Sequence, residues 1–159
     1  MKAVTVWQPW SWAIALGGKD VENRTRGTRH RGEIAIHAGK PWDEYGAADP
    51  RVLEAAGLLA GPLLPDERFV FGAIVAVADL VDVVRDSSSP WAAEGQVHWL
   101  LANVRPLGEP VPCRGWQNVW EVAPDVEALV RAQLRLTALP VTLSAGWTGA
   151  SCLRGAPIP

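Results

Sequence analysis

The chain has 159 residues, 48% of them hydrophobic, and a formal net charge of −2. This length and apolar content predict one domain of ordinary size, whose core needs no disulfide or metal. The balanced charge excludes a protein that is basic all over, but residues 1–40 carry seven Lys and Arg against three Asp and Glu, which allows a local basic patch.

Cysteine spacing and hydropathy exclude further classes of protein. Cys113 and Cys152 lie far apart and match no zinc-binding or redox spacing, so two reduced thiols are expected, with no metal and no cofactor. The first residues lack the smooth apolar segment of a signal peptide. The longest apolar stretch, Val70–Val84, contains a glycine and two aspartates and is shorter than the ~18 residues of a spanning helix. A cytoplasmic protein without a membrane partner is therefore expected.

The first 40 residues predict strands around one short helix. Pro9 suits the first turn of a helix over Trp10–Leu16, because its fixed φ and missing N–H cost nothing there, and the pair Gly17-Gly18 ends it. Strands are predicted by apolar content and alternation at Val4–Val6, Val21–Arg24 and Glu33–His37. The second and third of these are expected to form a hairpin with a basic tip.

The rest of the chain predicts more strands and two helices. Apolar runs indicate strands at Phe69–Val84, Val97–Val104, Val111–Cys113 and Val119–Val122. Pro106 is expected to end the second of these, because proline has no N–H for a sheet. Helices are predicted over Pro50–Leu59 and from Asp125, a suitable N-cap, to Ala138. Residues 1–138 would form the domain and 139–159, rich in Gly, Pro, Ser and Thr, a C-terminal tail.

Several segments follow one another in the order of a known family. They are Trp7-Gln8-Pro9-Trp10, Gly18-Lys19-Asp20-Val21-Glu22-Asn23-Arg24, Arg31-Gly32 and Ile36-His37-Ala38, and later Phe71–Val75 and Pro112–Trp120. In this order the chain resembles the ASCH domain, whose signature runs Gly-x-Lys-x-x-Glu-x-Arg after a Gln-Pro helix start. The resemblance covers residues 3–122. It implies an α+β fold, a PUA-like small β-barrel with flanking helices, which agrees with the many short strands.

The resemblance also implies recognition of RNA, a nucleotide or a nucleoside in a cleft lined by the Gly-Lys-Glu-Arg segment. One bacterial branch of the family hydrolyses the acetyl amide of acetylated cytidine, and another is reported as a ribonuclease. A hydrolase with Lys19 and Glu22 as catalytic residues therefore stays an alternative, as does a module that binds a protein partner.

The chain departs from the amidohydrolase branch at two positions. Glu22 stands where that branch has a threonine nucleophile, and Asp79 or Asp82 would have to serve in place of a glutamate. Glu22 is also expected to keep Lys19 protonated, whereas a lysine base needs a lowered pKa. These departures disfavour deacetylation.

Lys19, Glu22 and Arg24 suit a nucleotide ligand on chemical grounds as well. On a strand, Glu22 and Arg24 point to one face, and Lys19 in the preceding turn can reach the same side. The two cations would bind phosphate, and the carboxylate would accept a hydrogen bond from the exocyclic amine of cytosine. The alternative is a surface ion-pair cluster worth less than ~1 kcal/mol per pair.

Further candidate binding residues are basic, aromatic or polar side chains of the same segments: Gln8, Trp10, Arg26, Arg29, Arg31, His37 and Trp116. The basic tip would attract phosphate, unless the acidic remainder of the protein pairs with it. His37 is placed to face the cleft, although a lone histidine is more often structural. Trp116 is the expected stacking platform for a base, and Trp120 is expected in the core.

Overall fold

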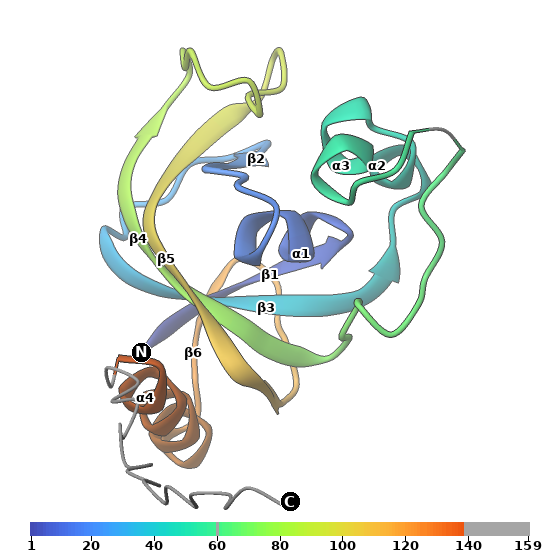
Figure 1. Ribbon diagram of the computed structural model, residues 1–159. Helices are drawn as coiled ribbons and strands as arrows, with labels where there is room; N and C mark the ends of the chain where they lie inside the picture. Colours follow the sequence, from blue (N-terminus) through green and yellow to red (C-terminus); the bar gives the residue numbers. More distant parts are fainter. Residues whose placement is uncertain (60, 139–159) are drawn as a thin grey trace, which may run out of the picture.

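The computed structural model describes residues 1–59 and 61–138, and the tail predicted over 139–159 lies outside the described residues. Six strands and four helices confirm the predicted α+β class (Figure 1). In chain order they are β1 (Lys2–Gln8), α1 (Trp10–Ala15), β2 (Val21–Arg24), β3 (Gly32–Trp42), α2 (Glu44–Ala47), α3 (Pro50–Ala55), β4 (Ala73–Val84), β5 (Val97–Pro112), β6 (Val119–Glu121) and α4 (Pro124–Ala138).

The strands form one mixed sheet in the order β2-β5-β4-β3-β1-β6. Only β1 and β3 run parallel, and the other neighbours are antiparallel. No hydrogen-bonded ladder joins the edge strands β2 and β6 within the described residues, so the predicted closed barrel is not confirmed. The sheet nevertheless curls until its two edges face each other. Arg24 of β2 and Val119 of β6 line the same hollow, which has a volume of about 370 Å³. We call this the seam hollow.

Both faces of the sheet are covered, which explains the apolar runs of its central strands. Val4 of β1 packs with Ile14 of α1, in a cluster inside the curve of the sheet. The next residue towards the N-terminus, Ala3, points the opposite way and packs with Val130 of α4. Side chains alternate along a strand, so one strand supplies two cores, and α1 and α4 lie on opposite faces (Figure 1).

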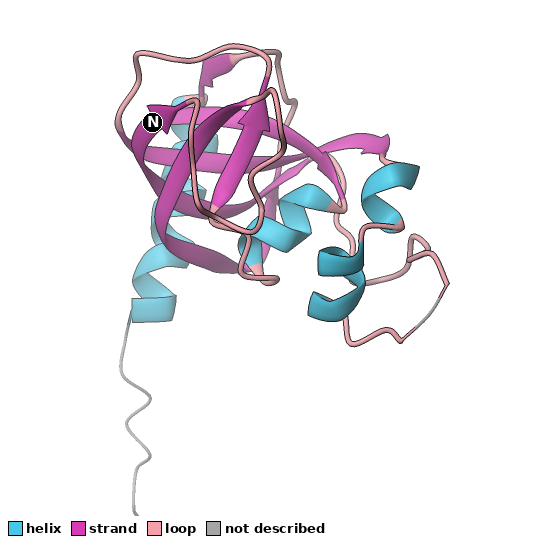
Figure 2. Cartoon of the chain, turned by 90° about the horizontal axis from the view of Figure 1, so that it is seen from above, coloured by secondary structure: helices cyan, strands magenta, loops and turns pink. Residues whose placement is uncertain are grey.

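A third apolar cluster joins α1 to α2, α3 and the segment that follows them. Its buried members include Trp12, Val52, Phe69 and Trp91. The rings of Trp12 and Phe69 meet edge to face, with centroids 5.7 Å apart. Figure 2 shows α2 and α3 gathered at one side of the strands, away from α4. No helix within the described residues has the length and apolar composition needed to cross a membrane.

The predicted hairpin between β2 and β3 is wrong. β2 pairs with β5, with Val21 opposite Leu100, while β3 lies between β1 and β4. The reason is burial: Ile34 and Ala35 of β3 face different apolar clusters, and both can be buried only in the interior of the sheet.

The predicted end of a strand at Pro106 is also wrong, because β5 continues to Pro112. Pro106 lies opposite Ala76 beside a shift of register between Ile74 and Ala76. A bulge of this kind tolerates a residue without an N–H, so the proline bends the strand and does not end it. The long β5 in turn brings residues after Pro112 to β1, where Thr5 contacts Trp116.

Candidate functional site

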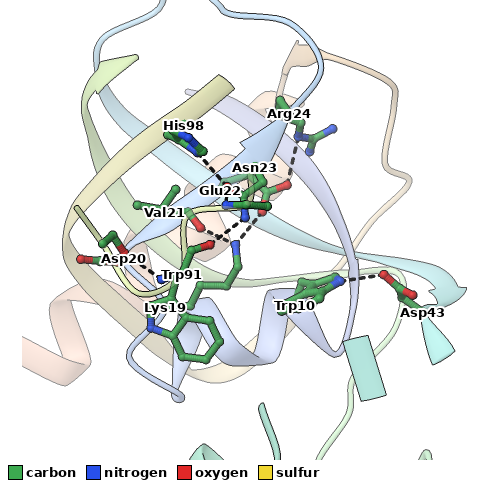
Figure 3. Close-up of polar contacts among 12 residues, drawn as sticks. Trp10, Lys19, Asp20, Val21, Glu22, Asn23, Arg24, Asp43, Trp91 and His98 are labelled. Carbon is green, nitrogen blue, oxygen red and sulfur yellow. Dashed lines mark hydrogen bonds and ion pairs between the residues drawn. The ribbon is translucent and has the colours of Figure 1, made fainter. Parts of the chain in front are cut away.

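Lys19 lies in the turn that joins α1 to β2. Gly18 adopts a left-handed conformation, with φ of 74°, which suits glycine and ends the helix. The backbone N–H of Lys19 donates to the Ala13 carbonyl at 3.0 Å, so the turn folds back under α1. The Lys19 side chain is only 2% exposed, and its Nζ donates to the Val21 carbonyl and, at 3.1 Å, to Oε2 of Glu22 (Figure 3).

Glu22 joins Lys19 to Arg24, as the alternation of β2 predicts. Arg24 Nε lies 3.0 Å from Glu22 Oε1, an ion pair whose angle falls short of a hydrogen bond. Arg24 Nη2 donates to the Thr5 carbonyl at 2.6 Å, and its Cζ lies 5.6 Å from the Trp99 ring centroid. These contacts fix the direction of a guanidinium that is still 28% exposed.

Asn23 points to the opposite face of β2 and holds the strand in place. Its Nδ2 donates to the Trp91 carbonyl at 2.8 Å, and its Oδ1 accepts from the Ala93 N–H at 3.1 Å (Figure 3). The same oxygen lies 2.9 Å from Nδ1 of the buried His98. β2 is thus fixed on both faces, which gives Lys19, Glu22 and Arg24 defined positions.

Lys19 and Glu22 border a hollow of about 340 Å³, here called the lysine hollow. Trp10 forms part of its wall, with its ring centroid 5.6 Å from Lys19 Nζ and its Nε1 donating to Asp43 at 2.8 Å. The other charged lining residues are Asp49 and Arg51, which form an ion pair. Two cations and two carboxylates balance one another, so this hollow does not favour an anion.

Burial changes the proton affinity of Lys19. Desolvation lowers the pKa of Lys19 below its ordinary value and outweighs the attraction of Glu22, which acts in the opposite direction. Glu22 thus favours the protonated lysine, as expected, but burial acts more strongly against it. The Arg51 side chain hydrogen-bonds Asp49 and holds the pKa of that carboxyl below its usual range, so Asp49 stays ionised beside Arg51.

A larger groove, of about 1450 Å³, is lined by Thr5 and Trp7 of β1, by His37 of β3 and by the loop after β5. Three cationic side chains line it, Arg24, Lys40 and Arg114, and none of its lining residues is acidic. Its exposed aromatic side chains are Trp7 (54% exposed), Trp116 (53%) and Phe71 (37%). We call it the basic groove. Cations without carboxylates attract an anion, and exposed indoles offer flat surfaces for stacking.

The loop over residues 113–118 is fastened to the sheet beneath it. His37 Nε2 donates to the Cys113 carbonyl at 3.1 Å, and Thr5 Oγ1 donates to the Trp116 carbonyl at 2.9 Å. Gly115 sits directly on the His37 ring, since a Cβ there would lie 2.3 Å from His37 Cε1 and 2.7 Å from Thr5 Oγ1. The Arg114 guanidinium lies 4.2 Å from the centroid of the Trp116 ring. The cation and the indole are therefore held together before any ligand arrives.

His37 forms part of the groove floor in its neutral state. A carbonyl only accepts hydrogen bonds, so the proton lies on Nε2, while Nδ1 is buried without a partner. Burial lowers the pKa of His37, and the hydrogen bond to Cys113 opposes this only in part. The ring also meets Trp120 edge to face, with centroids 5.7 Å apart.

The structure divides the predicted site residues among several places. Arg24, His37 and Trp116 line the basic groove, Trp10, Lys19 and Glu22 line the lysine hollow, and Arg26 lines the seam hollow. Lys19 and Arg24 therefore meet through Glu22 but face different spaces.

The remaining predicted residues have other surroundings. Gln8 is buried and structural: its Nε2 donates to the Val70 carbonyl at 2.8 Å, and its Oε1 accepts from the Trp12 N–H at 3.1 Å. Arg29 is exposed and lines neither hollow nor the groove, and Arg31 forms an ion pair with Asp82 at 2.9 Å. Asp82 is thus engaged by Arg31 and does not border the lysine hollow.

Asp79, the other acid proposed for the hydrolase, lies 3.4 Å from Arg105 and does not border the lysine hollow. Besides Glu22, the acid that borders this hollow is Asp49, which no motif indicated. Sequence reasoning also missed Trp7, Lys40 and Arg114. A signal existed for Trp7, because it alternates with the buried Val4 and Val6 and so must face away from the α1 core.

No family model matches the sequence, and no curated protein matches it either. Solved structures that the chain matches include the ASCH protein of Zymomonas mobilis, at 14% identity and a TM-score of 0.49, over 82% of this chain and 93% of that one. A tyrosine-to-phenylalanine mutant of the same protein gives 14% identity and a TM-score of 0.49, over 82% and 96% of the two chains. A serine-to-alanine mutant gives 13% and 0.48, over 82% and 94%. At this identity and TM-score, no residue role is taken from these structures. They are ASCH proteins, and the sequence motif of this chain resembles the ASCH family.

Proposed function

We propose that the chain binds single-stranded RNA or nucleotides in the basic groove. The observation that carries the proposal is the lining of this groove, which contains Arg24, Lys40 and Arg114 and no acidic residue. Phosphate is the anion that such a set suits, since guanidinium groups bind it with two parallel hydrogen bonds and lysine binds it as a point charge.

Aromatic exposure favours nucleic acid over a simple anion. Trp7 and Trp116 are both about half exposed at the groove, although large aromatic side chains are normally buried. Stacking of a base on an aromatic ring contributes about 1–3 kcal/mol and needs unpaired bases. A double helix does not present its bases in this way, so a single strand is the expected form.

Lys19 and Glu22 serve Arg24 in this proposal. Lys19 is too buried to reach a phosphate, but it holds Glu22, and Glu22 holds Nε of Arg24. A preorganised guanidinium loses less freedom when a ligand binds. The segment that the sequence singled out would thus act mainly by positioning one of the cations of the groove.

The test uses fluorescence anisotropy of a labelled single-stranded RNA of about 8 nucleotides, within the range for small single-strand binding domains. Replacing Lys40 and Arg114 together by alanine should weaken binding roughly tenfold or more and lower the salt slope by about 1.4, because about 0.7 is expected per single-strand phosphate contact.

The control removes two exposed arginines outside the groove, in an Arg29→Ala, Arg85→Ala double variant. It should bind almost as well as the unchanged protein. Equal weakening in both double variants would show that only overall charge matters, and the absence of RNA binding in the unchanged protein would reject the proposal.

A hydrolase is the second candidate, favoured by the lowered pKa of Lys19 beside a hollow walled by Trp10. A lysine with a lowered pKa is a better general base or nucleophile than an ordinary one. Turnover of acetylated cytidine, followed by chromatography, should be lost in Lys19→Met and kept in Lys40→Met, which changes an exposed lysine outside the hollow. The absence of turnover in the unchanged protein would reject this candidate.

A further inference from the structure

We infer that the ligand is a strand of several nucleotides that runs from the basic groove into the seam hollow, with its backbone passing Arg24. This inference rests on the proposed function and names the substrate class of the same site. It depends on how the two spaces are connected, how large they are and which charges line them.

The two spaces share lining residues. Arg24 and Asn118 border both the basic groove and the seam hollow. Arg24 belongs to β2 at one edge of the sheet, and Asn118 immediately precedes β6 at the other edge. The open seam of the sheet is therefore the place where the groove continues into the second space.

The size of the combined space exceeds that of a mononucleotide site. Pockets for one small ligand typically measure about 300–1,000 Å³. The basic groove alone measures about 1450 Å³, and the seam hollow adds a further space of about 370 Å³. A single nucleotide would leave most of this volume to solvent.

Positive charge continues along the same path. The seam hollow contains Arg26, which is exposed, and none of its lining residues is acidic. Arg26 thus follows Arg24 as the next cation on the path, beyond Lys40 and Arg114 in the groove. Phosphates recur at every nucleotide, so a series of cations suits a polynucleotide backbone better than one terminal phosphate.

Loop residues of the groove suit the bases of such a strand. Gln117 and Asn118 are exposed beside Trp116, and their amides carry both donors and acceptors. An amide next to a stacking ring can pair with the edge of an unpaired base. The backbone would then face the arginines while bases face the loop.

The test compares adenosine monophosphate with oligoadenylates of increasing length, each competing with a labelled oligoadenylate in anisotropy measurements. Affinity should rise with length until both spaces are filled, within the 4–16 nucleotides typical of small single-strand binding domains. Arg26→Ala should weaken the longer oligomers by about five- to tenfold, as expected for loss of one exposed charge-assisted contact, and leave the monophosphate unchanged.

Arg29→Ala is the matched control, because Arg29 is exposed in the same loop but does not line the seam hollow. It should bind every length like the unchanged protein. Monophosphate binding as tight as that of the longest oligomer, or equal losses in the two variants, would overturn the inference and leave the proposed function standing. The absence of binding at every length would contradict both the inference and the proposed function.

Oligomers of deoxyadenylate and an acidic peptide complete the comparison. If deoxyadenylate binds as well as the ribose form, the inferred path through the basic groove and the seam hollow stands, and it accepts single strands of RNA and of DNA. A peptide of glutamates that competes as strongly as the oligonucleotides would overturn the inference, because binding would then depend on negative charge alone and not on bases.

Discussion

At the residue scale, Gly115 shows how a missing side chain builds the basic groove. The Trp116 loop can rest on His37 and Thr5 only because nothing projects from position 115. Gly115→Ala would place a methyl group inside van der Waals contact of both, and overpacking of this kind costs about 1–3 kcal/mol.

The prediction is a loss of that size in the free energy of unfolding, measured with urea, together with weaker RNA binding as the loop lifts. Gly108→Ala is the control, because its nearest neighbour would be Gln133 Oε1 at 3.5 Å, an ordinary contact. Similar losses in both variants would mean that Gly115 is not specially confined.

His37 gives the molecule a predictable response to acid. Its pKa is lowered in the folded state, so the folded protein binds this proton less readily than the unfolded chain does. As pH falls from the ordinary histidine value of 6.5 towards the lowered one, the unfolded state gains the proton first, and the free energy of unfolding decreases.

A His37→Gln variant keeps a donor for the Cys113 carbonyl and has no charge to gain. Between neutral and mildly acidic pH it should therefore lose less stability than the unchanged protein, measured by urea unfolding at each pH. Equal losses in the two proteins would show that His37 takes up its proton freely in the folded state.

At the element scale, strand and helix positions followed from the sequence more closely than their pairing did. Alternation located β1, β2 and β3, and the Pro9 and Gly17 signals located α1. The pairing of β2 with β5 could not be read in this way, because it depends on which apolar faces meet across more than 70 residues of chain. The predicted end of the strand at Pro106 was wrong for a related reason, since the bulge that accommodates this proline forms only against β4.

The sequence predicted that the charged side chains of the candidate site meet, but not that they line separate spaces. The Lys19, Glu22 and Arg24 side chains do meet, as alternation along a strand requires. That Lys19 ends in one hollow and Arg24 in a separate groove depends on the curl of the sheet, which no local pattern records. Lys40 and Arg114 come from segments that only the fold brings together.

The last helix, α4, supplies a test of the outer core. Val130 on α4 is fully buried among Ala3, Ile74 and Val77, whereas its neighbour Leu129 is 58% exposed. Val130→Ala removes two buried carbon atoms and leaves a cavity, so it should cost about 2 kcal/mol of unfolding free energy.

Leu129→Ala should change the unfolding free energy by less than about 0.5 kcal/mol, as is usual for exposed positions. Urea unfolding of both variants measures the difference. Equal effects would mean that α4 does not use this face against the sheet.

At the scale of the whole molecule, the proposed function places ligand binding in two connected spaces of an acidic protein that are lined by cations. The net charge is −2, yet the basic groove and the seam hollow have no acidic lining residue. Elsewhere Arg31 pairs with Asp82 and Arg105 with Glu33, while Arg29 and Arg85 are exposed outside both spaces. Binding should therefore weaken steeply with salt, although the protein as a whole carries no excess of positive charge.

The tryptophans allow the most direct test of where a nucleic acid binds. The indole N–H signals in a proton–nitrogen correlation spectrum can be followed as single-stranded oligoadenylate is added. The signals of Trp7 and Trp116, at the basic groove, should shift first and furthest, and those of the buried Trp12 and Trp91 should stay in place. Unshifted signals for Trp7 and Trp116 under conditions in which the oligonucleotide binds would contradict the account.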